Sequence, residues 1–166
     1  MIYIKQAEVY YESSLCLTLA TKKFVALKVN PKMCENISLW CSYQTISFKV
    51  KQHSIYPCFA ILTAFNPRSI VLNEPSNILR NEILRSQLEK LTKDIQPVIC
   101  HDLQGCWLEN SFLTAISLEQ ACGLARQWQQ NAIYWGEYGK LYLVPVLMEG
   151  VTRMKLGEIK DFFYTE

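Results

Sequence analysis

The sequence has no long hydrophobic run and no large excess of charge of either sign, and each absence excludes a class of partner. No apolar run approaches the ~18–20 residues that a membrane-spanning helix needs. The net charge is +2, from 17 Lys and Arg against 15 Asp and Glu, which is too small to indicate nucleic acid or an anionic membrane surface. We therefore expect neither nucleic acid nor a membrane as a partner.

The familiar catalytic and metal-binding motifs are missing too. The sequence contains no G-x-S-x-G, P-loop, G-x-G-x-x-G or H-E-x-x-H pattern. Its histidines are His53 and His101, and no C-x-x-C pair is present to complete a zinc site. The nearest approach is the segment CHDLQGC over 100–106, where two or three ligands could meet around one turn. We expect no metal and no cofactor.

The N-terminus and the cysteines indicate a reducing compartment. The stretch MIYIKQAEVYY lacks the basic start, apolar core and cleavage site of a secretory signal. Seven cysteines are an odd number for a disulfide framework and are better explained as small buried hydrophobes. We therefore expect a cytoplasmic protein. Its 166 residues, 50% of them hydrophobic, suit a single domain over 1–166.

Hydrophobic periodicity predicts a mixed α/β (α+β) fold. Before residue 59 it predicts an N-terminal helix over 4–13, a hairpin over 15–30, a helix from Pro31 and a strand over 45–50. The tail over 148–166 is expected to dock on the core as a short strand or helix.

From Phe59 onward the predicted order is β-α-β-β-α-β with one extra C-terminal strand. The six elements span 59–65, 76–91, 95–100, 107–116, 117–130 and 132–135, and the extra strand spans 140–146. This order is that of the ferredoxin-like split βαβ core, an antiparallel sheet with both helices on one face. Pro97 predicts that its strand lies at a sheet edge. Ser117 and Gln120 predict a capping box at the start of the second helix.

Two polar and two apolar residues share one face of the predicted helix over 76–91. At spacings i, i+4, i+7 and i+11 they are Asn77, Asn81, Leu84 and Leu88. The leucines are expected to pack on the sheet. The two amides then lie at the start of the helix, beside the end of the strand over 59–65.

This junction is the predicted ligand site. The ends of strands and the starts of helices often bind ligands, because free backbone N–H groups and the helix dipole favour anions. Thr63 and Asn66 lie at the strand end, and Arg68 and Arg80 would strengthen the preference for an anion. The alternative is structural, since Asn66 before Pro67 is ordinary turn chemistry and the helix amides could merely bind the loop.

Glu109 is the second candidate, because it lies within an apolar strand. It shares a strand face with Trp107, Ser111 and Leu113. A buried carboxyl group can have a raised pKa that suits acid–base chemistry. The alternatives are a salt bridge to an arginine, Arg80 or Arg126, or exposure on an open face of the sheet.

Four ordered motifs resemble the bacterial family known as domain of unknown function 3293. They are AILTAFNP, SNILRNEIL, WLENSFLTAI and QQNAIYWG, and the resemblance covers about residues 7–145. It places the polar signature of the family on Thr63, Asn66, Asn77, Arg80, Asn81, Glu109, Ser111 and Gln130. It implies a small cytosolic bacterial α/β protein and supplies no activity. The chain departs from the pattern at Phe65, where Trp is usual, at Ser76, where Glu is usual, and at Gln129, where Gly is usual.

The leading hypothesis is a non-enzymatic binding or regulatory module. It would hold a small polar or anionic ligand, or a protein segment, at the end of the strand over 59–65 and the start of the helix over 76–91. Amides both donate and accept hydrogen bonds, so they suit recognition better than proton transfer. The expected ligand-binding residues are Thr63, Asn66, Asn77, Arg80, Asn81 and Gln130.

Two alternatives belong to other classes. In a small hydrolase or transferase, Glu109 would be the general acid or base, Asn66 and Asn77 would polarise the substrate, and Gln130 would orient it. In an interaction protein, an exposed sheet face or edge would dock a partner or a second copy of the chain. The aromatic residues expected on that face are Trp107, Tyr134 and Tyr142.

Overall fold

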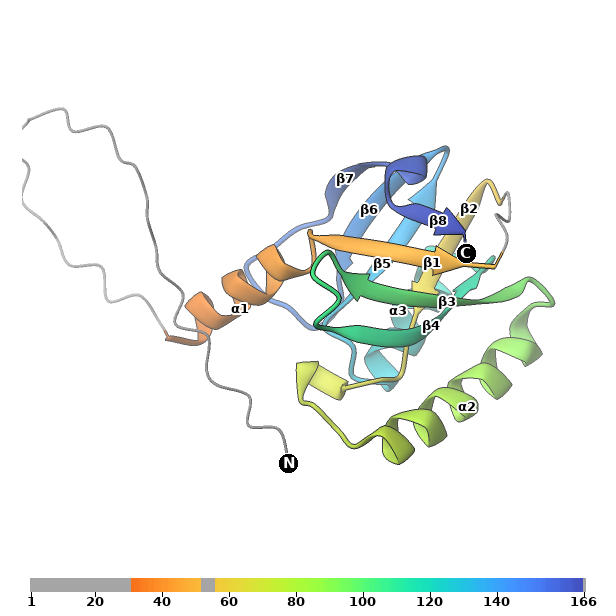
Figure 1. Cartoon of the computed structure of the whole chain (residues 1–166), viewed down its shortest axis with the longest axis horizontal. Helices are drawn as coiled ribbons and strands as arrows, with labels where there is room; N and C mark the ends of the chain where they lie inside the picture. Colours follow the sequence, from red (N-terminus) through yellow and green to blue (C-terminus); the bar gives the residue numbers. More distant parts are fainter. Residues whose placement is uncertain (1–30, 52–55, 166) are drawn as a thin grey trace, which may run out of the picture.

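The computed structural model describes residues 31–51 and 56–165. This part of the chain is mixed α/β, with three α-helices and a curled sheet of eight strands (Figure 1). The elements are α1 (Pro31–Ser42), β1 (Ile46–Val50), β2 (Cys58–Leu62), η1 (Pro67–Ser69), α2 (Glu74–Leu91), β3 (Ile95–Asp102), β4 (Leu108–Thr114), α3 (Leu118–Gln127), β5 (Ala132–Glu137), β6 (Lys140–Pro145), β7 (Met154–Glu158), η2 (Ile159–Asp161) and β8 (Phe163–Thr165). The helix predicted over 4–13 and the hairpin predicted over 15–30 lie outside the described residues.

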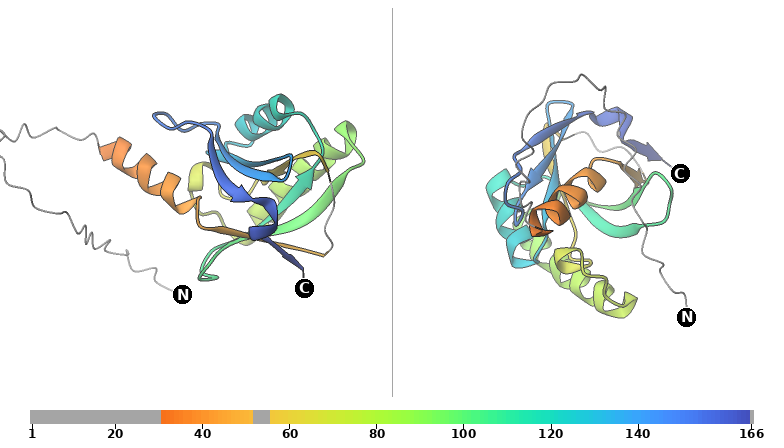
Figure 2. Two further views of the ribbon diagram at one scale, coloured as in Figure 1. Left: turned by 90° about the horizontal axis from the view of Figure 1, so that it is seen from above. Right: turned by 90° about the vertical axis from the view of Figure 1, so that its left-hand side faces the viewer.

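The centre of the sheet is formed by β5, β2, β4 and β3, in that order, and each neighbouring pair is antiparallel. α2 connects β2 to β3, and α3 connects β4 to β5. Leu84 and Leu88 of α2 share a buried cluster with Ala121 and Ala125 of α3, so both helices cover the same face of the sheet. Figure 2 shows the two helices together on that side. The predicted packing of the two leucines is therefore confirmed.

Both of these helices begin at capping side chains. At α2, Asn73 Oδ1 accepts the Ser76 backbone N–H at 2.9 Å. At α3, Ser117 and Gln120 form the predicted capping box. α3 ends earlier than predicted, at Gln127, and Gln129 then adopts a left-handed conformation with a φ of 58°. Glycine suits this position after a helix best, and glycine is the residue that the resemblance places there.

The short connection over 159–162 forces the sheet to curl, because it joins the two edge strands β7 and β8. Laid flat, eight strands would place the edges ~34 Å apart at ~4.8 Å per strand. The connection from Glu158 to Phe163 can reach only ~18 Å. The Phe163 ring of β8 also contacts the Phe59 ring of β2, with centroids 5.9 Å apart, although three strands separate β2 from β8 in the sheet. The curl gives the sheet a concave face, opposite α2 and α3.

A second buried cluster fills part of this concave face. Phe48, Leu141 and Leu143 are fully buried within it, and Trp40 of α1 joins them from outside the sheet. Figure 1 shows α1 at the end of the sheet away from α2. The concave face is therefore lined by the sheet and closed at one end by a helix.

The prediction that Pro97 marks an edge strand is wrong, since β3 lies between β4 and β1. The pairing of β3 with β1 ends at Val98, opposite Val50, whereas its pairing with β4 continues to Ile95. Within the described residues, Pro97 thus lies in the part of β3 that has a single neighbouring strand. The missing N–H of a proline is tolerated there because it removes no hydrogen bond to β1.

Gly136 of β5 tests the packing of the concave core. It faces Phe59 in the antiparallel register, and an added Cβ would overlap the Phe59 ring. We expect Gly136→Ala to lower the free energy of unfolding by ~1–3 kcal/mol, as overpacking does. Gly123→Ala on the exposed side of α3 meets no atom within 4 Å and should raise it by ~0.5–1 kcal/mol. Urea denaturation of both variants checks this, and equal effects would contradict the packing.

Candidate functional site

The connection between β2 and α2 forms one wall of the candidate site. β2 ends at Leu62, earlier than predicted, and α2 begins at Glu74. Between them, Asn66, Arg68 and Ser69 have left-handed backbone conformations, with φ of 42°, 56° and 60°. Such a conformation costs roughly 1 kcal/mol or more for a residue other than glycine. Other contacts must therefore hold this connection in its shape.

Asn66 and Asn77 supply such contacts through a reciprocal pair of hydrogen bonds. The Asn66 backbone N–H donates to Asn77 Oδ1 at 2.9 Å, and Asn77 Nδ2 donates to Asn66 Oδ1 at 2.8 Å. The Leu72 backbone N–H donates to the same Asn66 oxygen at 3.0 Å. Asn77 is only 4% exposed, so water cannot readily replace these partners. The Asn77 amide is thus directed at the preceding loop.

Asn81 and Arg80 bind both polar groups of Ala64. Asn81 Oδ1 accepts the Ala64 N–H at 3.0 Å, and Arg80 Nε donates to the Ala64 carbonyl at 2.8 Å. Asn81 Nδ2 also donates to the Asn110 carbonyl of β4 at 3.1 Å. The Arg80 guanidinium donates to the Trp128 carbonyl at 3.0 Å and lies over the Trp128 ring. Both side chains therefore support the backbone.

Gln130 and Thr63 support the same connection from other sides. Gln130 Nε2 donates to the Phe65 carbonyl at 2.8 Å. Thr63 Oγ1 donates to the Asn110 carbonyl at 2.8 Å and accepts the Phe65 N–H at 3.1 Å. The predicted site residues thus come together in space, and much of their hydrogen bonding is internal.

Glu109 of β4 is buried beside this network and is 6% exposed. Asn66 Nδ2 donates to its Oε1 at 2.7 Å, so its partner is an amide and not Arg80 or Arg126. Burial raises the pKa of the Glu109 carboxyl from an ordinary 4.5 to about 7, and the hydrogen bond from Asn66 partly opposes this rise. A carboxyl group with this pKa can change its protonation state near neutral pH.

Glu109 opens into a cavity of about 460 Å³ on the concave face, which we call the Glu109 cavity. Its polar wall includes Thr63, Asn66, Glu109, Ser111, Gln130 and Asn131. Its apolar wall includes Leu39, Ile46, Ile61, Ala132, Tyr134 and Leu143. Of the predicted ligand-binding residues, Thr63, Asn66 and Gln130 line this cavity, whereas Asn77, Arg80 and Asn81 lie outside its lining.

The rim of the cavity contains three residues that the sequence did not indicate, Tyr43, Ser69 and Asn131. Tyr43, which directly follows α1, and Ser69 share a hydrogen bond of 2.5 Å. Asn131 Nδ2 donates to both hydroxyl oxygens, at 3.2 and 3.1 Å. Tyr134 Oη donates to the Tyr43 carbonyl at 2.8 Å. In the sequence, the only indication of these rim residues was that Asn131 directly follows Gln130. Hydrophobic periodicity could not show that the end of α1 packs near β5.

The aromatic residues proposed for an interaction surface do not form one. Tyr134 is buried, and Trp107 packs against the concave core. Tyr142 is covered by the Arg153 guanidinium, whose carbon lies 4.0 Å from the ring centroid. These three residues therefore present no common exposed face.

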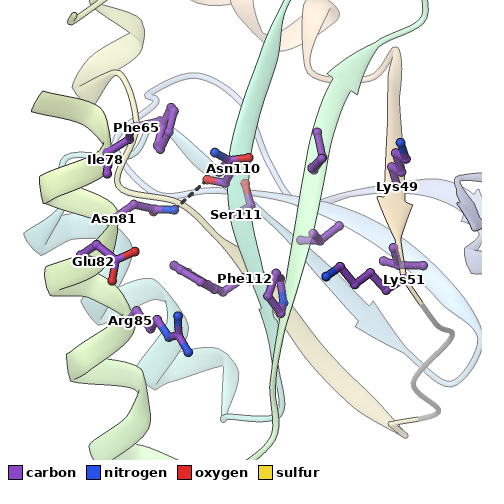
Figure 3. A pocket seen from close by; sticks show the side chains of 14 residues that line it. Lys49, Lys51, Phe65, Ile78, Asn81, Glu82, Arg85, Asn110, Ser111 and Phe112 are labelled. Carbon is purple, nitrogen blue, oxygen red and sulfur yellow. Dashed lines mark hydrogen bonds between the residues drawn. The ribbon is translucent and has the colours of Figure 1, made fainter. Parts of the chain in front are cut away.

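A second hollow of about 280 Å³ lies between α2 and strands β4, β3 and β1 (Figure 3). Asn81 points into the space between helix and sheet, where the dashed line marks its bond to Asn110. The charges around this hollow have both signs, including Lys51, Glu82 and Arg85, and Arg85 is paired with Glu89 at 3.0 Å. The Glu109 cavity is larger and contains a buried carboxyl group, so it is the stronger candidate site.

The turn over 100–106 does not assemble a metal site within the described residues, where no three His, Cys, Asp or Glu side chains lie close enough to hold an ion. Cys100 is buried, and desolvation raises the pKa of its thiol to about 12. His101 instead contacts Tyr164 of β8, with Nε2 2.5 Å from the hydroxyl oxygen. Across the described segments, no helix has the length and apolar character needed to cross a membrane.

Comparison with known proteins covers the part of the chain that contains the hydrogen-bond network around Glu109. Residues 62–133 match the family described as protein of unknown function (DUF3293). This confirms the resemblance indicated by the motifs, over a shorter range than 7–145. The match runs from the end of β2 to the start of β5 and includes the whole network around Glu109. No curated protein and no solved structure matches the chain.

The hydrogen bonds of Asn81 predict a structural effect of its removal. Asn81→Ala leaves the buried Ala64 N–H without its acceptor, and we expect the free energy of unfolding to fall by ~1–3 kcal/mol. The matched control is Asn110→Ala, which keeps the Asn110 carbonyl and removes only an exposed side chain. It should change stability by less than ~0.5 kcal/mol. Urea denaturation measures both, and a neutral Asn81→Ala would show that the amide does not hold the connection.

The raised pKa of Glu109 predicts how stability varies with pH. Because the folded-state pKa lies above the unfolded value, protonated Glu109 stabilises the fold fully below about pH 4.5, and this contribution is lost as pH rises through about 7. The stability of wild type relative to Glu109→Gln should therefore fall by roughly 3 kcal/mol between acidic pH and about pH 8. Denaturation of both proteins across this range checks it, and a constant difference would mean an ordinary Glu109 pKa.

Proposed function

We propose that this protein is a non-enzymatic binding or regulatory module that holds a small molecule in the Glu109 cavity. The observation that carries the proposal is a buried carboxyl group on the wall of a cavity of about 460 Å³. Ligand pockets are commonly concave, mostly apolar, ~300–1,000 Å³ in volume, and fitted with a few convergent polar groups. We keep the site at the position expected from the sequence, the end of β2, because Thr63 and Asn66 line the cavity.

The cavity wall has an apolar part and a polar part, and this favours an amphipathic ligand. Ile61, Leu143 and Ile46 offer an apolar surface for the body of a molecule. Glu109 and Gln130 offer polar atoms for one hydrogen-bonding group. A molecule with a polar end and an apolar body would satisfy both surfaces, because apolar burial contributes affinity and the polar pairing fixes orientation.

The strain in the wall supports a functional role. Asn66 and Ser69 both adopt left-handed conformations and both line the cavity. Backbone strain of this kind tends to occur at ligand sites, where the surrounding structure holds it in place. Here the Asn77 amide holds it, through the hydrogen bonds to Asn66. The loop is thus fixed in shape before any ligand binds.

The second candidate function is a small hydrolase or transferase with Glu109 as general acid or base. The observation that favours it is the pKa of about 7, since a group that titrates near the working pH transfers protons efficiently. Asn66 and Gln130 would then orient the substrate. The two functions separate once a ligand is found, because an enzyme releases an altered molecule and a binding module releases the same one.

Two broader assignments accompany this proposal. The order β5-β2-β4-β3, with α2 and α3 on one face, supports a ferredoxin-like split βαβ core extended by strands at both edges. The motif resemblance and the odd number of cysteines support a cytoplasmic bacterial protein.

Filling the cavity tests the binding function. We expect a thermal-shift screen of amphipathic metabolites to give hits that stabilise wild type, since a ligand at 100 times its Kd adds about 2.7 kcal/mol. Ala132→Phe places a ring in the cavity and should abolish these shifts. The control Ser86→Phe adds the same ring on the exposed side of α2 and should retain them. Hits that survive Ala132→Phe, or a screen without hits, would refute the proposal.

A further inference from the structure

We infer that the molecule bound in the Glu109 cavity is a cation with N–H donors, such as a protonated primary amine, whose charged nitrogen pairs with the Glu109 carboxylate. This inference rests on the proposed function and names the chemical class of its ligand. It replaces the expectation of a small polar or anionic ligand, which came from the strand end and helix start and was strengthened by Arg68 and Arg80.

The first argument is the charge of the cavity wall. Glu109 and Asp102 line the cavity, and its described lining contains no lysine, arginine or histidine. Arg80 is directed elsewhere, because its guanidinium donates to the carbonyls of Ala64 and Trp128. An anion would lose its hydration beside a carboxyl group with no counter-charge, which is strongly unfavourable. A cation would meet its counter-charge at Glu109.

The second argument is that several acceptor oxygens of the polar wall receive no hydrogen bond from the described residues, whereas much of its donor capacity is used within the protein. Thr63 Oγ1, Asn66 Nδ2, Gln130 Nε2, Asn131 Nδ2 and Tyr134 Oη all donate to protein atoms. Glu109 accepts only one hydrogen bond from the described residues, at Oε1. The side-chain oxygens of Gln130 and Asn131 accept none from them. A ligand that donates hydrogen bonds therefore complements this wall, whereas one that only accepts them does not.

The third argument is the surroundings of Glu109. Cys100 on β3, Tyr134 on β5 and Tyr43 directly after α1 are the titratable groups that face the cavity around it, with Asp102 further along β3. None of these side chains is of a type that carries a positive charge, and burial raises the pKa values of Cys100 and Tyr134. Nothing among the described neighbours therefore competes with a bound cation for the Glu109 charge. Aromatic rings in the wall, such as Tyr134, also attract cations.

This ligand class has a consequence for pH. Glu109 must lose its proton to pair with an ammonium group, so binding releases a proton at pH values below the Glu109 pKa of about 7. The affinity for an amine should rise roughly tenfold per pH unit from acidic pH up to that value and then level off. A neutral ligand that accepts a hydrogen bond from protonated Glu109 would show the opposite trend.

The test compares three probes of one shape and different charge. They are 2-phenylethylamine, 2-phenylethanol and 3-phenylpropanoate, titrated into the full chain while two-dimensional ¹H–¹⁵N NMR follows the backbone amides. We expect the amine to shift the resonances of Asn66, Glu109 and Ala132 and to bind at least tenfold more tightly than the acid. Glu109→Gln should weaken the amine at least tenfold and weaken the alcohol much less, because the amide removes the charge but keeps polar atoms for a hydroxyl group. The pH series on wild type tests the charge independently of this variant.

The outcomes separate this inference from the proposed function. If the alcohol or the acid shifts the cavity resonances as strongly as the amine, the cavity binds ligands and the assignment to cations is wrong. The same follows if Glu109→Gln binds the amine normally or if the affinity does not rise with pH. If none of the three probes shifts the cavity resonances at millimolar concentration, both the inference and the proposed function are wrong.

Discussion

The reciprocal hydrogen bonding between Asn66 and Asn77 is the constraint on which the rest of the site depends. The chain leaves β2 through a tight turn with left-handed residues, and a free loop would not keep that shape. The Asn77 side chain accepts from the Asn66 backbone and donates to its side chain, at 2.9 and 2.8 Å. With its own oxygen occupied, the Asn66 amide donates one of its two side-chain N–H groups to Glu109. Through Asn66, helix α2 thereby orients the Glu109 carboxyl group of β4, a strand far from it in the sequence.

The curl of the sheet supplies the second requirement, which is burial. β7 and β8 lie at opposite edges of the sheet but are joined by residues 159–162 alone. The concave face that results encloses every second residue of β4, among them Glu109 and Ser111. Burial is the main cause of the raised Glu109 pKa, so the chemistry of this residue follows from the path of a tail far from it in the sequence.

Local patterns predicted much of this structure, and long-range contacts account for what they missed. The leucine stripe of α2, the capping box of α3 and the face of Glu109 depend on neighbours along the chain, and each could be inferred from spacing. The direction of an amide cannot, because Asn81 on a buried helix face could point to a ligand or, as it does, to the Ala64 backbone. Pro97 was misleading because an interior strand can extend beyond the end of one of its two neighbouring strands. Tyr43 reaches the site only through tertiary packing.

The same internal hydrogen bonds determine the character of the cavity. An amide side chain carries donors on its nitrogen and acceptors on its oxygen, and the buried carbonyls of the strained loop take up donors. Gln130 shows this directly, since its nitrogen binds the Phe65 carbonyl while its oxygen has no partner among the described residues. Asn131 at the rim is similar, since its nitrogen donates to Tyr43 and Ser69 while its oxygen accepts no hydrogen bond from the described residues. A fold that uses amide donors to hold its backbone thus leaves a cavity rich in acceptors beside a carboxyl group, and such a surface selects a cation on electrostatic grounds.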